Sequence, residues 1–371
     1  MKKLFFIIIL INLVSCTKDK YPDLKEGVYA EITTNKGVII TKLEFEKTPI
    51  TVANFILLSE GKHPYIKEEF KNKNFYDGLS FQLNGMLVQS VNPKSTNNQL
   101  GYTFEDELPT GNEGDFLFTH NKAGILSMAN FGRNTNSTSF FITLNEAPTL
   151  DGKYTVFGNV VKGMDVLKKL STNDKIVKVV IIRKGKSANN FNALNTFKTY
   201  YKALSEKKDK EYAKIKKKTD RAKKAKKQMR NFIFNNKKLA KTYPSGLRML
   251  ITKKGTENKP KKDSQVYVDF AGFLEDGSLF GTTVLKTAEI FNQYDEQFDQ
   301  DNKYHPIIML YSNKAKLIKG LKEGLQKMQY GEKAMLFIPA KLAYGKKGDG
   351  YKVPPNTDLV IEVEILDKKI E

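Results

Sequence analysis

A long lysine-rich segment with helical periodicity divides the chain and limits the folds that it can adopt. Between residues 202 and 241 there are 17 Lys or Arg residues and four acidic ones, so this stretch supplies 13 of the net charge of +21. Apolar residues before it recur at the spacing of one helical face, at Phe191, Leu194, Phe197, Tyr201 and Leu204. The 371 residues also exceed the usual size of one domain. We therefore predict two folded domains joined by a basic helical linker over residues 188–241.

The residues before this linker predict a domain rich in short strands. Val28 to Leu43 contains two β-rich runs that are divided by a turn at Asn35 to Gly37, which predicts a hairpin. Thr51 to Leu58 has the apolar spacing of a helix. Short β-like runs separated by Gly, Asn and Asp continue to Ile182, a pattern typical of a closed β-barrel with few helices. This first domain is predicted over residues 27–187.

The residues after the linker predict a second domain over residues 242–371. Strands are expected at Leu247 to Thr252, Val266 to Leu274, Ala334 to Ile338 and Asp358 to Leu366. One short amphipathic helix is expected at Ala315 to Met328. The fold class is therefore mostly β with helices, and the second domain is an α+β domain in which a twisted antiparallel sheet wraps on a short helix.

The first 16 residues resemble a targeting segment. Lys2 and Lys3 precede an apolar run that is too short to span a bilayer, and Leu13 to Cys16 resembles a bacterial lipobox, in which the Cys is lipidated after cleavage. Several acyl chains would anchor the protein stably. We expect a lipoprotein signal peptide over residues 1–16 and a lipid-anchored protein of the cell envelope, at the outer membrane or cell surface rather than the inner membrane. The alternatives are an ordinary secretory peptide and a cytoplasmic protein.

The charge of the linker allows two interpretations. One is a solvated helix face, and the other is attraction to anionic lipid or glycolipid headgroups, to which each nearby Lys contributes ~1 kcal/mol. Nucleic acid is not expected as a partner of an exported lipoprotein, although the positive charge would suit it.

The cysteine and histidine content argues against metal or thiol chemistry. Cys16 is the only cysteine, so no intramolecular disulfide can form. His63, His120 and His305 are scattered without the spacing of metal ligands. We predict no metal site, and no cofactor is expected.

Residues 124–160, GILSMANFGRNTNSTSFFITLNEAPTLDGKYTVFGNV, are similar to the central motif of cyclophilins. NFYDGLSF at 74–81 and YTFEDE at 102–107 extend the resemblance over most of 27–187. The family catalyses cis/trans isomerisation of the bond before proline on an eight-stranded β-barrel that is capped by two helices. Amide rotation has a barrier of ~18–20 kcal/mol, so uncatalysed exchange is slow. A catalyst needs an apolar slot for the proline ring and a donor that favours the twisted amide.

The resemblance implies a substrate groove in the first domain but an incomplete set of catalytic residues. The implied groove residues are Met86, Leu87, Gln89, Ala129, Asn130, Phe141, Leu150 and Tyr154. Gln82-Leu83-Asn84 replaces the family's histidine-arginine pair, with a loop about two residues shorter. Ser139, Thr149 and Tyr154 replace a glutamine, a tryptophan and a histidine. We therefore expect weak or no isomerase activity from this domain.

VDFAGFLEDGSLFGTT at 268–283, LIKGLKEGLQKMQYGEKAMLFIPAKLAYG at 317–345 and VPPNTDLVIEVEIL at 353–366 resemble FKBP-type isomerases. The resemblance covers 242–371, apart from an insertion within about 284–305. It implies a proline pocket of Phe270, Phe280, Ile307, Leu317, Ile318, Leu321, Tyr344, Val353 and Ile361. Tyr344 carries a hydroxyl that could donate to a substrate carbonyl. Gly281 replaces an aspartate, Phe270 a tyrosine and Ile361 an aromatic residue, which leaves the pocket more apolar.

The sequence therefore allows two functions. The first is a peptidyl-prolyl isomerase that assists folding of exported proteins at Xaa-Pro bonds, chiefly through the second domain. The second is a non-catalytic, chaperone-like lipoprotein that holds unfolded or proline-containing polypeptides on two immunophilin scaffolds. Both make exported polypeptides the partners, together with the membrane through Cys16.

Overall fold

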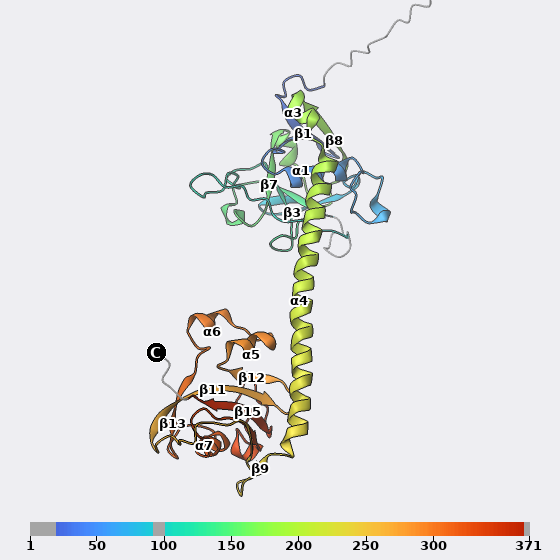
Figure 1. Cartoon of the computed structure of the whole chain (residues 1–371). Helices are drawn as coiled ribbons and strands as arrows, with labels where there is room; N and C mark the ends of the chain where they lie inside the picture. The colour runs from blue at the N-terminus through green and yellow to red at the C-terminus, as the bar shows by residue number, and fades with distance from the viewer. Residues whose placement is uncertain (1–19, 92–100, 367–371) are drawn as a thin grey trace, which may run out of the picture. The chain divides into compact units, whose positions relative to one another are not determined.

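The computed structural model describes residues 20–91 and 101–366, and the chain forms two compact units, residues 1–207 and 208–371 (Figure 1). Cys16 and the predicted signal peptide lie outside the described residues. Among the described helices, none has the length and apolar character needed to cross a membrane.

The first unit is built on one antiparallel sheet of eight strands. These are β1 (Gly27–Thr34), β2 (Gly37–Leu43), β3 (Ser80–Asn84), β4 (Leu87–Val91), β5 (Ile125–Met128), β6 (Phe140–Thr143), β7 (Val156–Lys162) and β8 (Ile176–Lys184). They lie in the order β3-β4-β6-β5-β7-β2-β1-β8. The edge strand β3 meets the start of β8 at a single bridge between Ser80 and Lys175. The predicted closed barrel is therefore confirmed in part, as a curled sheet whose edges are not paired along their length.

Short helices accompany this sheet. They are α1 (Pro49–Ser59), α2 (Met164–Leu167), α3 (Gly185–Asn190), η1 (Glu68–Phe70) and η2 (Pro148–Leu150). The predicted β1–β2 hairpin is present, and Thr34 pairs with Gly37 at its turn. Helix α1 starts with Pro49, whose fixed φ suits the first turn of a helix. Glu107 accepts bonds from the free backbone N–H groups of Ile50 and Thr51, so this helix end is capped from a distant segment.

Helix α4 (Ala193–Lys237) begins in the first unit, and its first three turns belong to the core of that unit. The Phe197 ring is completely buried and lies 4.8 Å from the His63 ring and 6.0 Å from the Tyr102 ring, centroid to centroid. Tyr201 stacks on Tyr65 at 4.2 Å. The segment from 193 to 204, which the sequence places in a linker, is thus an integral part of the first unit.

The second unit contains an antiparallel sheet of seven strands. These are β9 (Lys241–Thr242), β10 (Arg248–Lys253), β11 (Ser264–Leu274), β12 (Leu279–Thr282), β13 (Ile307–Tyr311), β14 (Lys333–Ile338) and β15 (Leu359–Ile365). Their order is β12-β11-β15-β14-β10-β9, with β13 paired to β11. The helices are α5 (Leu285–Ile290), α6 (Glu296–Gln300), α7 (Lys319–Leu325) and η3 (Ala340–Leu342). Helix α7 is shorter than the predicted Ala315 to Met328, because the flanking residues form turns instead of continuing the helix.

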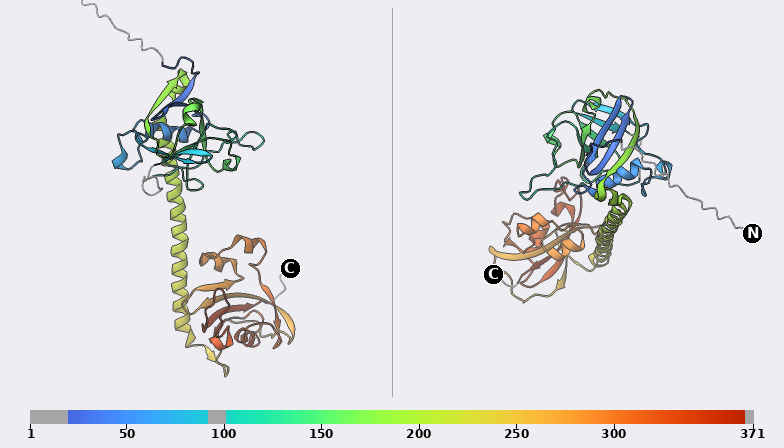
Figure 2. Two further views of the ribbon diagram at one scale, coloured as in Figure 1. Left: turned by 180° about the vertical axis from the view of Figure 1, so that it is seen from behind. Right: turned by 90° about the horizontal axis from the view of Figure 1, so that it is seen from above.

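Both faces of this second sheet carry apolar clusters, because its strands alternate inward and outward side chains. One face packs on α7 through residues that include Leu321, Leu325 and Leu336. The other packs on the last turns of α4 through Ile233 and its neighbours Phe273 and Phe337. Figure 2 shows the second unit in two further orientations. The end of the predicted linker is therefore also part of a folded unit, and the sheet lies between two helices.

Candidate functional sites

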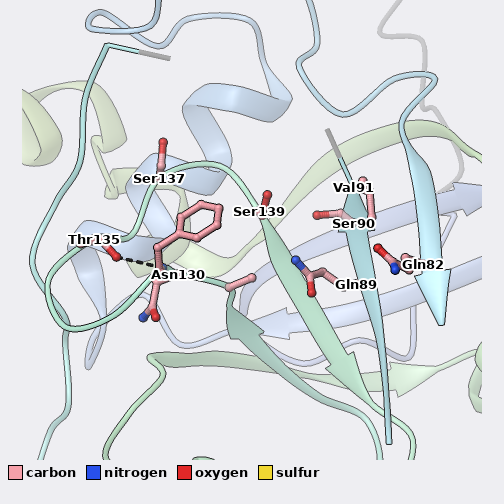
Figure 3. Close-up of a pocket in the computed structure, with 10 residues that line it drawn as sticks. Gln82, Gln89, Ser90, Val91, Asn130, Thr135, Ser137 and Ser139 are labelled. Carbon is pink, nitrogen blue, oxygen red and sulfur yellow. Dashed lines mark hydrogen bonds between the residues drawn. The ribbon is translucent and has the colours of Figure 1, made fainter. Parts of the chain in front are cut away.

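The first unit has a cavity of about 190 Å³ between the β3–β4 hairpin and the loop that follows β5. Figure 3 shows its side chains. Seven of its ten lining residues carry polar side chains: the lining consists of Gln82, Gln89, Ser90, Val91, Ala129, Asn130, Phe131, Thr135, Ser137 and Ser139. Gln82 and Gln89 pair across the hairpin, so both amides lie at one end of the cavity. The hollow therefore offers amide and hydroxyl groups, which suit the carbonyl and N–H groups of a bound peptide.

The loop that forms the second wall is held by its own hydrogen bonds. The Phe131 N–H donates to Thr135 Oγ1 at 3.0 Å, the dashed line in Figure 3, and Thr135 Oγ1 donates to the Gly132 carbonyl at 2.7 Å. Asn130 Nδ2 donates to the Asn136 side chain at 3.3 Å. These bonds keep the loop in shape and leave the Phe131 ring 73% exposed. An exposed ring on an ordered loop can contact the apolar side chain of a ligand.

Three of the predicted groove residues, Gln89, Ala129 and Asn130, line this cavity. The lining does not include the other five: Met86, Leu87, Phe141, Leu150 and Tyr154. Of these, Phe141 is paired with the lining residue Gln89 on the neighbouring strand. Gln82 and Ser139, which the sequence marks as departures from the family, are lining residues. Their place in the lining was not predictable from their residue types.

Beneath these residues lies a buried hydrogen-bond network that the sequence did not reveal. His120 Nδ1 lies 2.8 Å from Asp151 Oδ1, and its Nε2 lies 3.1 Å from Ser127 Oγ. The imidazole stacks on Phe141 at 5.8 Å and 20°. Burial lowers the pKa of His120, although the bond to Asp151 opposes this shift. Ser127 is fully buried, so this arrangement supports Phe141 and is not a nucleophilic triad.

Among the described residues that line the cavity, none supplies the cationic donor expected of this family. Leu83 stands in the segment that replaces the histidine-arginine pair, and its side chain is 40% exposed. Arg133 does not line the cavity, and its guanidinium pairs with Asp106 and donates to the Gly152 carbonyl. The described lining of the cavity can therefore bind a peptide through neutral groups, and it places no cation at the prolyl nitrogen.

In the second unit, the predicted pocket residues gather around one apolar cluster. Leu321, Val353 and Ile361 are buried in it, and Phe270, Phe280, Leu317 and Ile318 are partly buried against it. Ile307 and Tyr344 are 38% and 39% exposed, at the solvent side of their elements. The structure thus brings seven of the nine residues to one cluster and leaves two at the surface.

Two contacts explain why the phenylalanines of this cluster are fixed. The Phe280 ring lies over Gly272 of the neighbouring strand, where a Cβ would be 2.3 Å from the ring. Only glycine at 272 leaves room for it. Phe270 is held through its backbone, since its N–H donates to Thr283 Oγ1 and its carbonyl accepts from Thr282 Oγ1, both at 2.9 Å.

The rim of the cluster is a loop organised by Asp349. Its Oδ1 accepts bonds from the backbone N–H groups of Tyr351, Lys352 and Val353 at 2.7–2.8 Å. Partial desolvation opposes ionisation, but these three bonds lower the pKa of Asp349. Partial burial raises the pKa of Tyr344 at the same rim, so its phenol keeps its proton. Its hydroxyl bonds to no described residue and can donate to a substrate carbonyl.

The insertion at 284–305 forms a second wall beside this cluster. Tyr304 stacks on Tyr294 at 6.0 Å and meets the Phe298 ring at 4.9 Å. A cavity of about 130 Å³ runs from this aromatic group to Gly281 and Lys352, which adjoin Phe280 and Val353 in the chain. A Cβ at Gly281 would meet nothing within 4 Å, so the lost carboxylate leaves open space. The arrangement places the apolar cluster beside the aromatic rings of the insertion, and these groups can bind a proline ring.

No cluster of three or more side chains suited to a metal ion occurs in the described parts of the chain. The basic segment of α4 between 208 and 224 is largely exposed.

Comparison with known proteins gives a family match for each unit. A family model for cyclophilin type peptidyl-prolyl cis-trans isomerases matches residues 29–187, and one for FKBP-type peptidyl-prolyl cis-trans isomerases matches residues 256–366. Peptidyl-prolyl cis-trans isomerase CYP18-2 of Arabidopsis thaliana is 36% identical over 155 residues, which are 40% of this chain and 84% of that protein. Peptidyl-prolyl cis-trans isomerase-like 3 of Homo sapiens is 39% identical over 151 residues, 38% of this chain and 83% of that protein. A cyclophilin type isomerase of Cryptosporidium parvum aligns with a TM-score of 0.34 and 26% identity, over 42% of this chain and 98% of that structure.

Proposed function

Because the chain belongs to the cyclophilin-type peptidyl-prolyl cis-trans isomerases and also carries an FKBP-type domain, we propose that its isomerase activity resides chiefly in the second domain. The observation that supports this division is the contrast between the two sites. The described lining of the cavity in the first unit includes no cationic donor, whereas the second unit keeps an apolar cluster with the Tyr344 hydroxyl at its rim.

The chemistry required is modest, because no bond breaks and no proton must move during prolyl isomerisation. The catalyst has to bind the twisted amide better than either planar isomer. Around Phe280, Ile318 and Val353 the proline ring would leave water, and the Tyr344 hydroxyl would hold a flanking carbonyl. The loss of about 5 kcal/mol from the barrier corresponds to roughly 3.7 decades in rate.

The test compares matched variants of the full-length chain by NMR exchange spectroscopy on an unstructured Xaa-Pro tetrapeptide. We expect Phe280→Ala to lower kcat/KM at least about tenfold, which corresponds to about 1.4 kcal/mol. Tyr344→Phe, at an exposed position, should lower it severalfold without affecting folding. Gln82→Ala combined with Gln89→Ala should change it less than about twofold.

A large loss from the paired glutamine variant and none from Phe280→Ala would place the activity in the first domain and contradict the division. A chain that binds proline-containing polypeptides without accelerating exchange would support the second function, client holding. The absent cation and the open space at Gly281 are the observations that favour this alternative.

The proposed setting is the cell envelope, with exported polypeptides as substrates. Its support is the lipobox-like Leu13 to Cys16, and the basic stretch of α4 would add attraction to anionic headgroups. Expression in a Gram-negative host and intact mass measurement of the membrane fraction test this. Lipidated protein should appear in that fraction, and Cys16→Ser should release it. Equal partition of both proteins would contradict the anchor.

A further inference from the structure

The second unit has a larger cavity, of about 480 Å³, on the α4 face of its sheet. Its walls are the last turns of α4, Arg248 of β10 and Glu275 of the turn that follows β11. Ile233 is 3% exposed at its floor, whereas the Phe234 ring at its edge is 79% exposed. The exposed Phe234 ring thus lies on a helix at the edge of the cavity, an arrangement typical of binding surfaces.

The rim of this cavity is positively charged and incompletely paired. Lys237 contacts Glu275 and lies 3.7 Å from Asp358 Oδ2. Arg230, Lys238 and Arg248 line the same cavity and form no ion pair with the described residues. Three unpaired cations around an apolar floor complement an anion that also carries an apolar group.

The cavity is separate from the proline site of the same unit. Arg248 is paired with Phe337, which belongs to the α4-side cluster, and the next residue, Met249, belongs to the α7-side cluster. The proline pocket residues gather on the α7 side. A ligand could therefore occupy this cavity while a proline is bound, and changes here should not alter the proline site.

The shape of the site favours a polypeptide over a bilayer surface. Binding to a membrane surface requires a continuous apolar stripe along a helix. Between residues 208 and 231, α4 exposes only two large apolar side chains, Tyr212 and Ile215, on a strongly basic surface. Here the cations come from two elements and surround a hollow, which suits one apolar side chain flanked by carboxylates.

We propose that this cavity, with Phe234, Arg230, Lys238 and Arg248 as its contacts, binds acidic polypeptide segments that carry an apolar or aromatic side chain. Such a site gives the isomerase a second binding site for a long polypeptide substrate. Because this cavity and the proline pocket are on one folded unit, binding in the cavity raises the effective concentration of the substrate's prolines near the proline pocket.

The probe is a fluorescein-labelled peptide of 12 residues with Asp, Glu, Gly and Ser around one central Phe and no proline, titrated by anisotropy against the full-length protein. We expect saturable binding that weakens at least tenfold with Phe234→Ser, and likewise with Arg230→Glu combined with Lys238→Glu. Changing the central Phe of the probe to Ala should weaken binding similarly. The three substituted positions of the protein, Phe234, Arg230 and Lys238, are exposed, so the variants should still fold.

Matched controls lie on the same helix away from the cavity. Tyr212→Ser removes another exposed ring, and Lys214→Glu with Lys217→Glu makes the same charge change at exposed positions. Both should bind the probe within about twofold of the parent, and all variants should isomerise a short Xaa-Pro tetrapeptide at the parent rate. Equal losses in the controls would show diffuse charge attraction and overturn the site. So would no probe binding together with Phe234-dependent binding to phosphatidylglycerol vesicles, which would assign the cavity to lipid.

Discussion

Gly277 lies so close to the backbone of α4 that a Cβ at this position would be 2.2 Å from the carbonyl oxygen of Lys226. The same turn is tied to the helix by Asp276, which accepts a hydrogen bond from Lys226 Nζ at 2.7 Å. Partial burial opposes ionisation of Asp276, but this bond lowers its pKa to about 2. The last turns of α4 thus pack on the second unit through this close backbone contact as well as through the apolar cluster around Ile233.

Gly277→Val should detach this part of α4. The residue has φ +83°, a conformation that costs a β-branched residue about 1–2 kcal/mol, and the added atoms would overlap the helix at a further cost of about 1–3 kcal/mol. We expect faster hydrogen exchange over residues 226–237, measured by mass spectrometry. Gly281→Ala is the control, because its Cβ meets nothing within 4 Å. Unchanged protection in Gly277→Val would show that the contact is not needed for docking.

Phe197→Ala should destabilise the first unit, although the residue lies in the predicted linker. Its ring is fully buried among His63, Tyr102 and Tyr201, so its removal leaves a cavity that costs about 3–5 kcal/mol. Urea unfolding monitored by hydrogen exchange over residues 27–184 measures this loss. Tyr212→Ala, on a ring that is 70% exposed, should cost less than about 0.5 kcal/mol. Equal effects of the two changes would contradict the packing of α4 on this unit.

His63 should make the first unit sensitive to acid. Burial lowers its pKa from 6.5 to about 3, and its Nε2 is buried and has no hydrogen-bond partner among the described residues. The unfolded chain binds a proton below pH 6.5 and the folded chain does not, so stability falls as pH decreases from 6.5 towards 3, by up to about 1.4 kcal/mol per pH unit. His63→Phe keeps the stacking and removes the titrating group, so its urea midpoint should fall less between pH 6.5 and 5. His305→Phe, at an exposed position, should retain the parent slope.

Asp349→Ala should impair isomerisation more than stability. Three backbone N–H groups lose their acceptor, so the rim that carries Val353 loosens. We expect KM for a tetrapeptide to rise about three- to tenfold, with the unfolding midpoint little changed. Asp349→Asn retains an oxygen acceptor and should restore most of the activity, which separates an acceptor role from a requirement for charge. A fall in kcat alone would contradict this role.

Much of the architecture could be predicted from local patterns. The hairpin at 27–43 follows from two β-rich runs around a turn, and the terminal strand β15 follows from alternation over residues 359–365. The sequence also showed that Leu83, Ser139 and Gly281 replace residues typical of the two families, because the surrounding motifs fix which positions correspond. These features depend on neighbours in the chain, whose periodicity and turn chemistry act over a few residues.

Other features depend on contacts that no local pattern encodes. The apolar spacing of Phe197 and Tyr201 predicted a helix but not the surface that it covers. The linker prediction did not include the packing of both ends of α4 in apolar clusters. His120 and Asp151 are 31 residues apart and meet only because the chain folds back.

The sequence alone therefore determined the two scaffolds, the residues missing from their sites and the helical character of the basic segment. The tertiary structure alone decided which side chains line each cavity, that Gln82 and Ser139 share one of them, and that both ends of α4 belong to folded units. The physical reason is that periodicity reports which face of an element is apolar, whereas the burial of that face is decided by packing between segments far apart in the chain.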